Sequence, residues 1–179
     1  SSDDSFYSLN DTWSGSLNTR IYEAYVDANQ IDGLEKLRIG RQALYETPEY
    51  LAFDGAMFKT ERDPSGTQTG AYAGIPFRAY ESSRSDNKLA GAWVETMPWR
   101  GGRVRFDYVY LKDDLQVEDK QNNLVALGVW QTFDQYLRVR GNYSRVEGKN
   151  RDAEFAATYY DPELDLTVQA LYKEQLTTQ

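Results

Sequence analysis

Apolar and polar residues alternate with a period of two along most of the chain. In the stretch YLRVRGNYS, residues 136–144, Arg138 and Arg140 fall on one parity, whereas Leu137 and Val139 fall on the other. Side chains alternate across a β-strand, so this pattern predicts strands with one oily face and one charged face. Equally clean alternation is found in residues 103–112, 153–160 and 164–173.

Several other segments alternate more loosely, and none shows convincing helical periodicity. The looser strands are predicted within residues 20–28, 36–42 and 71–80. Arg41 breaks the parity of its segment, and Pro76 is awkward for a central strand. Residues 124–131 are apolar on both parities, so their facing stays open. The pattern predicts one all-β domain over residues 1–179, with about ten strands joined up-and-down in an antiparallel sheet.

The connections between these strands alternate between short and long. Tight turns are predicted at NQIDG, PWRGG, TFDQ and DPEL, and longer polar links at ESSRSDN, KDDLQVEDKQNN and VEGKNRD. This alternation predicts consecutive hairpins, with short turns at one end of the sheet and longer links at the other end.

Composition removes several function classes. The chain has no Cys and no His, which excludes disulfides, thiolate nucleophiles, Ser-His-Asp triads and the usual zinc sites. A net charge of −8 disfavours nucleic acid as a partner. Fourteen Tyr, seven Phe and four Trp argue against disorder. We therefore expect neither an enzyme nor a bound cofactor or metal.

Alternation fits a soluble β-sandwich or small ligand-binding barrel as well as a membrane barrel. No apolar run reaches the roughly 18 residues of a membrane-spanning helix, but a barrel strand needs only about 9 to 11. Strand length, the asymmetric links and aromatic residues beside the short turns favour the membrane barrel. The predicted interfacial aromatic girdle consists of Trp99, Trp130, Phe133, Tyr136 and Tyr159.

The segment EAYVDANQIDGLEKLRIGRQALYETPEYLAFDG, residues 23–55, resembles a hairpin region of Gram-negative outer-membrane porins, nearest to the alginate-export type. The matching elements are EAYVD, LRIGRQ after a short turn, and FDG shortly afterwards. The resemblance implies a transmembrane β-barrel in the bacterial outer membrane that allows passive passage of solutes. Members usually end on an aromatic residue and are longer, whereas this chain ends KEQLTTQ. We therefore expect either a small barrel or a segment of a larger one.

In such a barrel the polar parity faces a watery lumen, and guanidinium groups there favour anionic solutes. In the alternative, the arginines pair with carboxylates on neighbouring strands and only solvate the interior. The predicted pore-lining residues are Glu23, Arg38, Arg78, Glu95, Arg103, Arg105, Asp107, Arg138, Arg140 and Glu154.

Three functions remain open from the sequence. The first is a porin-like channel for small, anionic solutes, in contact with membrane lipid and lipopolysaccharide. The second is a barrel that sheathes or scaffolds a partner protein, which bulky inward residues would favour; Tyr25, Tyr72, Tyr80 and Trp93 are candidates. The third is a soluble β-barrel that binds a small apolar ligand.

Overall fold

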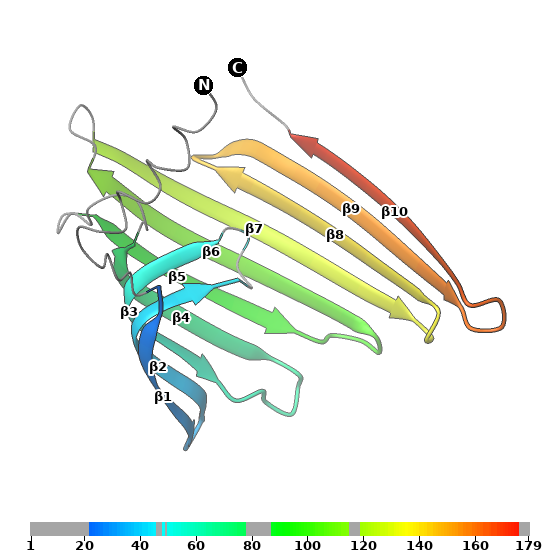
Figure 1. Cartoon of the computed structure of the whole chain (residues 1–179), viewed down its shortest axis with the longest axis horizontal. Coiled ribbons are helices and arrows are strands. Elements are labelled where there is room, and N and C mark those ends of the chain that lie inside the picture. Colours follow the sequence, from blue (N-terminus) through cyan, green and yellow to red (C-terminus); the bar gives the residue numbers. More distant parts are fainter. Residues whose placement is uncertain (1–21, 46–47, 49, 78–86, 115–118, 176–179) are drawn as a thin grey trace, which may run out of the picture.

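The computed structural model describes residues 22–45, 48, 50–77, 87–114 and 119–175, and these form an all-β structure (Figure 1). Ten strands follow one another along the chain: β1 (Ala24–Ile31), β2 (Leu34–Leu44), β3 (Leu51–Thr60), β4 (Gln68–Pro76), β5 (Lys88–Thr96), β6 (Gly102–Asp114), β7 (Asp119–Phe133), β8 (Leu137–Val146), β9 (Lys149–Asp161) and β10 (Leu166–Gln175).

Each strand pairs antiparallel with the next, so the spatial order β1 to β10 is the chain order. This arrangement confirms the up-and-down sheet of ten strands that the alternation predicts. The sheet is not closed in this structure. Among the described residues, β1 and β10 each keep one edge without a neighbouring strand.

The register between strands fixes which residues share a face. Arg103 on β6 lies opposite Trp130 on β7, and Trp130 lies opposite Arg140 on β8. Arg105 lies opposite Glu95 in the same way. Residues directly opposite each other project from the same face, so the charged parities of neighbouring strands combine into one charged face. The opposite parities form the second face.

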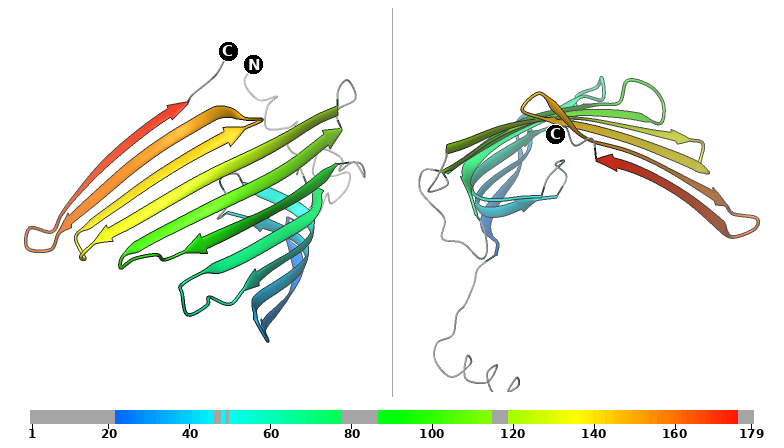
Figure 2. Two further views of the ribbon diagram at one scale, coloured as in Figure 1. Left: turned by 180° about the vertical axis from the view of Figure 1, so that it is seen from behind. Right: turned by 90° about the horizontal axis from the view of Figure 1, so that it is seen from above.

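The sheet is strongly curved, as Figure 2 shows from behind and from above. The charged face holds nearly all of the buried side chains, whereas the second face is largely exposed. The charged face is therefore the concave one, and the second face is convex. The register also settles residues 124–131: Leu124, Ala126 and Trp130 lie on the concave face, and Leu127 lies on the convex face.

A row of glycines explains the sharp curvature across β1 to β4. Gly40 on β2 lies opposite Gly55 on β3, which lies opposite Gly74 on β4. A Cβ atom on Gly40 would overlap the carbonyl oxygen of Ala24, and one on Gly55 would overlap that of Ala73. Glycine is the one residue that permits such close backbone approach, and glycine kinks are a known source of sheet curvature.

The two ends of the sheet differ less than the sequence predicts. One end, called the turn end here, carries the connections 32–33, 61–67, 97–101, 134–136 and 162–165; the other, the link end, carries 45–50, 77–87, 115–118 and 147–148. The tight turns NQIDG, PWRGG, TFDQ and DPEL all lie at the turn end, as predicted. VEGKNRD is not a long link, because Glu147 and Gly148 form a tight turn with positive φ and β9 begins at Lys149. Much of KDDLQVEDKQNN likewise belongs to β6 and β7.

Candidate functional site

The concave face gathers most of the side chains that the sequence marks as pore-lining. Those placed on it by the register are Arg38, Glu95, Arg103, Arg105, Asp107, Arg138, Arg140 and Glu154. Glu23 precedes β1 and accepts a hydrogen bond from the Tyr45 hydroxyl at 3.4 Å. Arg78 and Tyr80 lie outside the described residues.

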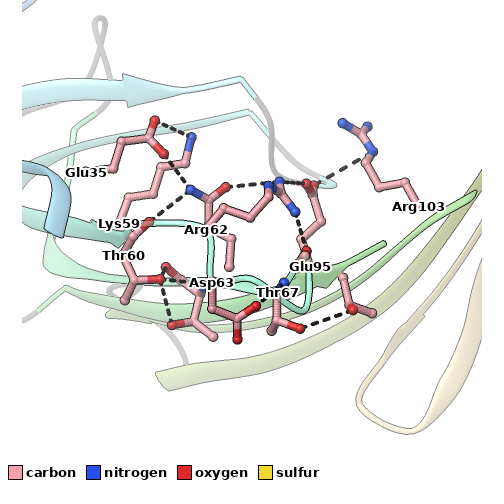
Figure 3. A network of polar contacts seen from close by, with 12 residues as sticks. Glu35, Lys59, Thr60, Arg62, Asp63, Thr67, Glu95 and Arg103 are labelled. Carbon is pink, nitrogen blue, oxygen red and sulfur yellow. Dashed lines mark hydrogen bonds and ion pairs between the residues drawn. The ribbon is translucent and has the colours of Figure 1, made fainter. Parts of the chain in front are cut away.

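The most connected part of this face lies near the turn end, where the link between β3 and β4 brings Arg62 to Glu95 (Figure 3). One guanidinium nitrogen of Arg62 donates to Glu95 Oε1 at 2.5 Å and to Gln68 Oε1 at 3.2 Å. The other terminal nitrogen donates to the Gly66 carbonyl at 2.6 Å. Arg103 approaches the second oxygen of Glu95 at 3.8 Å. The Glu95 carboxylate is therefore shared by two arginines.

The network continues across β2 and β3. Gln68 donates to Glu35 Oε2 at 2.5 Å and to the Thr60 carbonyl at 2.9 Å, and Lys59 Nζ donates to Glu35 Oε1 at 3.0 Å. Glu35 reaches this position because a register shift between Leu34 and Lys36 inserts an extra residue into β2. A β-bulge of this kind re-aims a side chain out of the normal alternation.

Asp63 holds the connecting link in shape. Its Oδ1 atom accepts hydrogen bonds from the Ser65 hydroxyl at 2.7 Å and from the Thr67 amide at 2.8 Å. These bonds to the charged carboxylate, led by the one from Ser65, lower the pKa of Asp63 below its usual value. The link is thus a defined turn that positions Arg62.

Two tryptophans support arginines on the same face. The Arg103 guanidinium carbon lies 4.1 Å from the centroid of the Trp130 ring, and that of Arg105 lies 4.5 Å from the Trp93 ring. Such stacking uses the flat face of the guanidinium and leaves its N–H edge available for hydrogen bonds. Trp93 packs over Gly70 on β4, and Trp130 packs over Gly128 on its own strand; neither glycine site has room for a side chain.

Carboxylates accompany most of these arginines. Arg105 and Asp107 form the most buried ion pair among the described residues, with a shortest distance of 2.8 Å and 7% exposure of each side chain. Arg140 Nη2 donates to Glu154 Oε1 at 2.5 Å on the neighbouring strand. Arg138 has no ion pair within the part of the chain that the structure describes. Arg105 and Asp107 lie on the same strand, β6. Cross-strand pairing, one of the two alternatives for these arginines, is present for Arg38, Arg103 and Arg140.

Arg38 on β2 repeats the same arrangement outside the lining of the cavity described below. Its guanidinium forms a bidentate pair with Asp27 on β1, with distances of 2.6 and 2.8 Å, and stacks 3.5 Å from the Tyr25 ring centroid. Arg41, which breaks the sequence parity, lies on the convex face instead and pairs there with Asp54 at 2.7 and 2.8 Å.

A cavity of about 500 Å³ opens between the charged side chains near the turn end. Its lining includes five cationic residues, one carboxylate and two tryptophans: Lys59, Arg62, Gln68, Trp93, Glu95, Arg103, Arg105, Trp130 and Arg140. This cationic cavity is the feature of the concave face best suited to hold a charged molecule.

The link end of the concave face is apolar by contrast. Phe53, Tyr72, Leu89, Val109 and Leu124 form a buried cluster there. A wider cavity of about 720 Å³ lies against this cluster, with Leu51, Leu111 and Val146 among its lining residues. The concave face therefore changes from charged to apolar along the strands.

The convex face is apolar and exposed. Large hydrophobic side chains project from it on every strand except β8, where they are half-buried; examples are Val26, Ile39, Phe58, Ile75, Val94, Phe106, Leu127, Phe155 and Val168. Among the described residues, its charged side chains are the Arg41–Asp54 pair and five residues near strand ends: Lys88, Lys112, Arg145, Asp161 and Glu174. Between these ends the face carries almost solely apolar, small and aromatic residues.

The aromatic residues expected in a girdle do not all share one face. Phe133 and Tyr159 lie on the convex face in one cross-strand row with Leu137. Trp99 and Tyr136 lie in connections at the same end and are 52% and 38% exposed. Trp130 lies on the concave face against Arg103, so it cannot share a convex belt with the other four.

A second aromatic group lies toward the link end and was missed from the sequence. The hydroxyls of three convex-face tyrosines bond polar residues: Tyr108 donates to Asn123 at 2.8 Å, Tyr143 to Asn150 at 2.5 Å and Tyr172 to Glu174 at 2.9 Å. Apolar rings with polar tips suit a boundary between oil and water. The alternating sequence pattern placed these tyrosines in strands but did not distinguish them as an aromatic group.

Sequence reasoning also missed several members of the cationic cavity. Arg62 lies in the link between β3 and β4. Glu35, which contacts the cavity residues Lys59 and Gln68, is turned toward them by a bulge that no sequence pattern indicates. Lys59 and Gln68 lie at strand ends and carried no distinguishing motif. The one available signal was an Arg two residues after the end of β3, within ERDPSGTQTG.

Within the described residues, no group of three or more Asp or Glu side chains is placed to hold a metal ion. The same residues contain no helix long and apolar enough to cross a membrane. No family model matches the chain, and neither a curated protein nor a solved structure shows significant similarity to it.

Proposed function

We propose that the chain forms all or part of a β-barrel channel in a bacterial outer membrane, with its convex face toward lipid. The observation that carries the proposal is the distribution of polarity: most of the ion pairs lie on the concave face, where Arg105–Asp107 is buried, while apolar side chains cover the exposed convex face. A soluble sheet would bury its apolar face and wet its charged one.

The size of the convex face supports this assignment. Ten strands about 4.8 Å apart give a face about 43 Å wide along the sheet, and soluble monomers rarely expose apolar patches above a few hundred Å². Every strand except β1 has at least nine residues, the length that crosses a bilayer. The aromatic groups at both ends match the two girdles of such barrels.

A sheet in lipid needs all of its backbone groups paired, so the two open edges must also acquire partners. We infer that the unpaired edges of β1 and β10 are closed in the membrane, either onto each other or through further strands. On the convex face near the link end, Lys88 lies opposite Lys112. Two cations at this end of the face suit contact with the phosphates of lipid or lipopolysaccharide.

With the convex face in lipid, the concave face lines the passage. Its arginines, held by neighbouring carboxylates and tryptophans, favour small anionic solutes over cations. The ion pairs reduce this preference, because most guanidinium groups already have a carboxylate beside them. We therefore expect modest anion selectivity rather than exclusion of cations.

Single-channel recording in a planar bilayer under a salt gradient tests this function. The proposal predicts discrete current steps with a reversal potential displaced toward that of the anion. Current steps without ion selectivity would support the channel function but contradict the preference for anions. A protein that remains monodisperse without detergent and never inserts would contradict the membrane assignment and favour the soluble ligand-binding barrel.

A second function is favoured by the apolar cluster on the concave face. A water-filled passage gains nothing from the exposed cavity against Leu51, Leu89 and Val146, whereas an apolar segment of a partner protein would cover it. In that case the sheet is a sheath around the partner. Stable membrane insertion without current steps would favour this role, if current steps then arise when the apolar lining residues are replaced by Ser.

A further inference from the structure

The cationic cavity has the geometry of a discrete binding site and not only of a polar wall. Lys59, Arg62, Arg103 and Arg140 reach it from four different elements, namely β3, the β3–β4 link, β6 and β8. Cations that converge from several elements onto one space of about 500 Å³ can contact one ligand at the same time. A wall of scattered charges would not do so.

The cations that line the cavity differ in how tightly they are paired. Five cationic residues and one carboxylate, Glu95, line the cavity itself. The network of Figure 3 adds the carboxylates of Glu35, which holds Lys59, and of Asp63, which bonds Ser65 and Thr67. Of Lys59, Arg62 and Arg103, Arg103 has the longest contact, 3.8 Å to a carboxylate that Arg62 already holds at 2.5 Å. Among these three cations, Arg103 is therefore the one held least tightly by a carboxylate.

Arg103 and Arg140 are also prepared for a ligand. Both flank Trp130 in one cross-strand row, and their side chains remain 42% and 46% exposed. The Trp130 ring supports the flat face of Arg103, which reduces the number of conformations that the guanidinium must lose on binding. The N–H edge of the Arg103 guanidinium is thereby preformed as a fork for the two oxygens of an oxyanion.

We propose that this cavity binds one oxyanion group, a phosphate or carboxylate, between Arg103, Arg62 and Arg140, with Glu95 acting as the resident counter-ion that the ligand displaces from Arg103. The Glu95 carboxylate is 6% exposed, bonds Arg62 and mimics the ligand in its contact to Arg103. An incoming oxyanion replaces a weak contact with two parallel charge-assisted hydrogen bonds. The proposal deepens the proposed function, since the ligand is a solute of the same passage.

Equilibrium dialysis with radiolabelled inorganic phosphate tests the site without requiring conduction. The purified full chain in detergent micelles is dialysed at constant ionic strength with chloride as the balancing anion. We expect saturable binding of one phosphate per chain. Arg103→Gln is expected to weaken binding about tenfold or more, and Arg103→Lys to weaken it less, because Lys keeps the charge but loses the fork.

Two further variants make the test specific. Glu95→Gln removes the competing carboxylate and is expected to tighten phosphate binding severalfold. Arg38→Gln removes a concave-face arginine with its own carboxylate and aromatic partners outside the cavity, and is expected to leave binding unchanged. Far-UV circular dichroism and protease resistance verify that each variant is folded.

The outcomes separate this site from the channel. Absence of saturable phosphate binding, equal loss in Arg103→Gln and Arg38→Gln, or weaker binding in Glu95→Gln would overturn the site. Phosphate binding without channel current would leave the site and contradict the channel. Current without phosphate binding would leave the channel and remove the site.

Discussion

At the scale of single residues, the concave face illustrates how the setting of an ion pair decides its importance. The Arg105–Asp107 pair is almost fully buried, whereas the Arg140 side chain of the Arg140–Glu154 pair is 46% exposed. Breaking a buried pair leaves a desolvated charge, which costs far more than losing a screened surface contact. Two Arg–carboxylate pairs on the same face are therefore expected to contribute differently to stability, because one is buried and the other is partly exposed.

We predict that Asp107→Asn lowers the free energy of unfolding by about 3 kcal/mol, because it leaves the buried Arg105 guanidinium without its carboxylate. Glu154→Gln, the matched control on the exposed pair, is expected to change it by less than about 1 kcal/mol. Reversible urea unfolding in lipid vesicles measures both. Equal effects of the two variants would contradict the burial argument.

The stability of the β3–β4 link is expected to depend on pH through Asp63, which lies outside the strands. Its pKa in the folded chain is lowered by the Ser65 hydroxyl and the Thr67 amide. The contribution of these bonds is therefore present above the ordinary carboxyl pKa and is lost as the pH falls through the lowered folded value. The Thr67 amide resonance should titrate with a midpoint below the usual Asp value, and in Asp63→Asn the acid titration should vanish. A midpoint at or above that value would contradict the turn.

At the scale of elements, the glycine row of β2 to β4 makes the curvature testable. Gly55→Ala is expected to reduce the free energy of unfolding by more than about 2 kcal/mol or prevent folding, because the new Cβ overlaps the Ala73 carbonyl. Gly141→Ala on β8, where a Cβ meets nothing within 4 Å, is expected to be neutral or slightly stabilising. The urea midpoints of the two variants provide the comparison.

Eight of the ten strands could be placed from the sequence, because the period-two alternation is strong wherever one face is apolar, whereas β3 and β5 had no predicted segment of their own. Prediction failed at strand ends. Lys149 and Asn150 belong to β9, yet VEGKNRD is polar on both parities. A strand that continues beyond the apolar band is wet on both faces, so its sequence is indistinguishable from a loop by polarity alone.

The candidate site was predictable only in its strand residues. Alternation places Arg103, Arg105 and Arg140 on the charged parity of their own strands. It does not indicate how far apart the side chains of neighbouring strands lie. Arg62 and Glu35 join them through a turn and a bulge, two features that depend on backbone geometry. The facing of Trp130 was missed for a related reason, since residues 124–131 are apolar on both parities.

At the scale of the whole molecule, the structure is an open curved sheet with an exposed apolar convex face and a concave face that carries most of the charges. The exposed apolar face connects the fold to the proposed function, because transfer of that face from water to lipid is favourable. The proposed function also predicts that the edges of β1 and β10 acquire partner strands, because backbone groups in lipid must be hydrogen-bonded. In lipid, β1 and β10 should exchange their backbone amides slowly, whereas in an open soluble sheet their outer edges would exchange fast.

The proposed function requires that the convex face meets lipid and that the concave face meets water. The chain has no Cys, so single Cys substitutions can carry one spin label each at positions 137, 138, 139 and 140 of β8, in vesicles. We predict that labels at 137 and 139 collide with oxygen and that those at 138 and 140 collide with a water-soluble nickel chelate. Labels at 137 and 139 that are buried in protein, with 138 and 140 in bulk solvent, would contradict it.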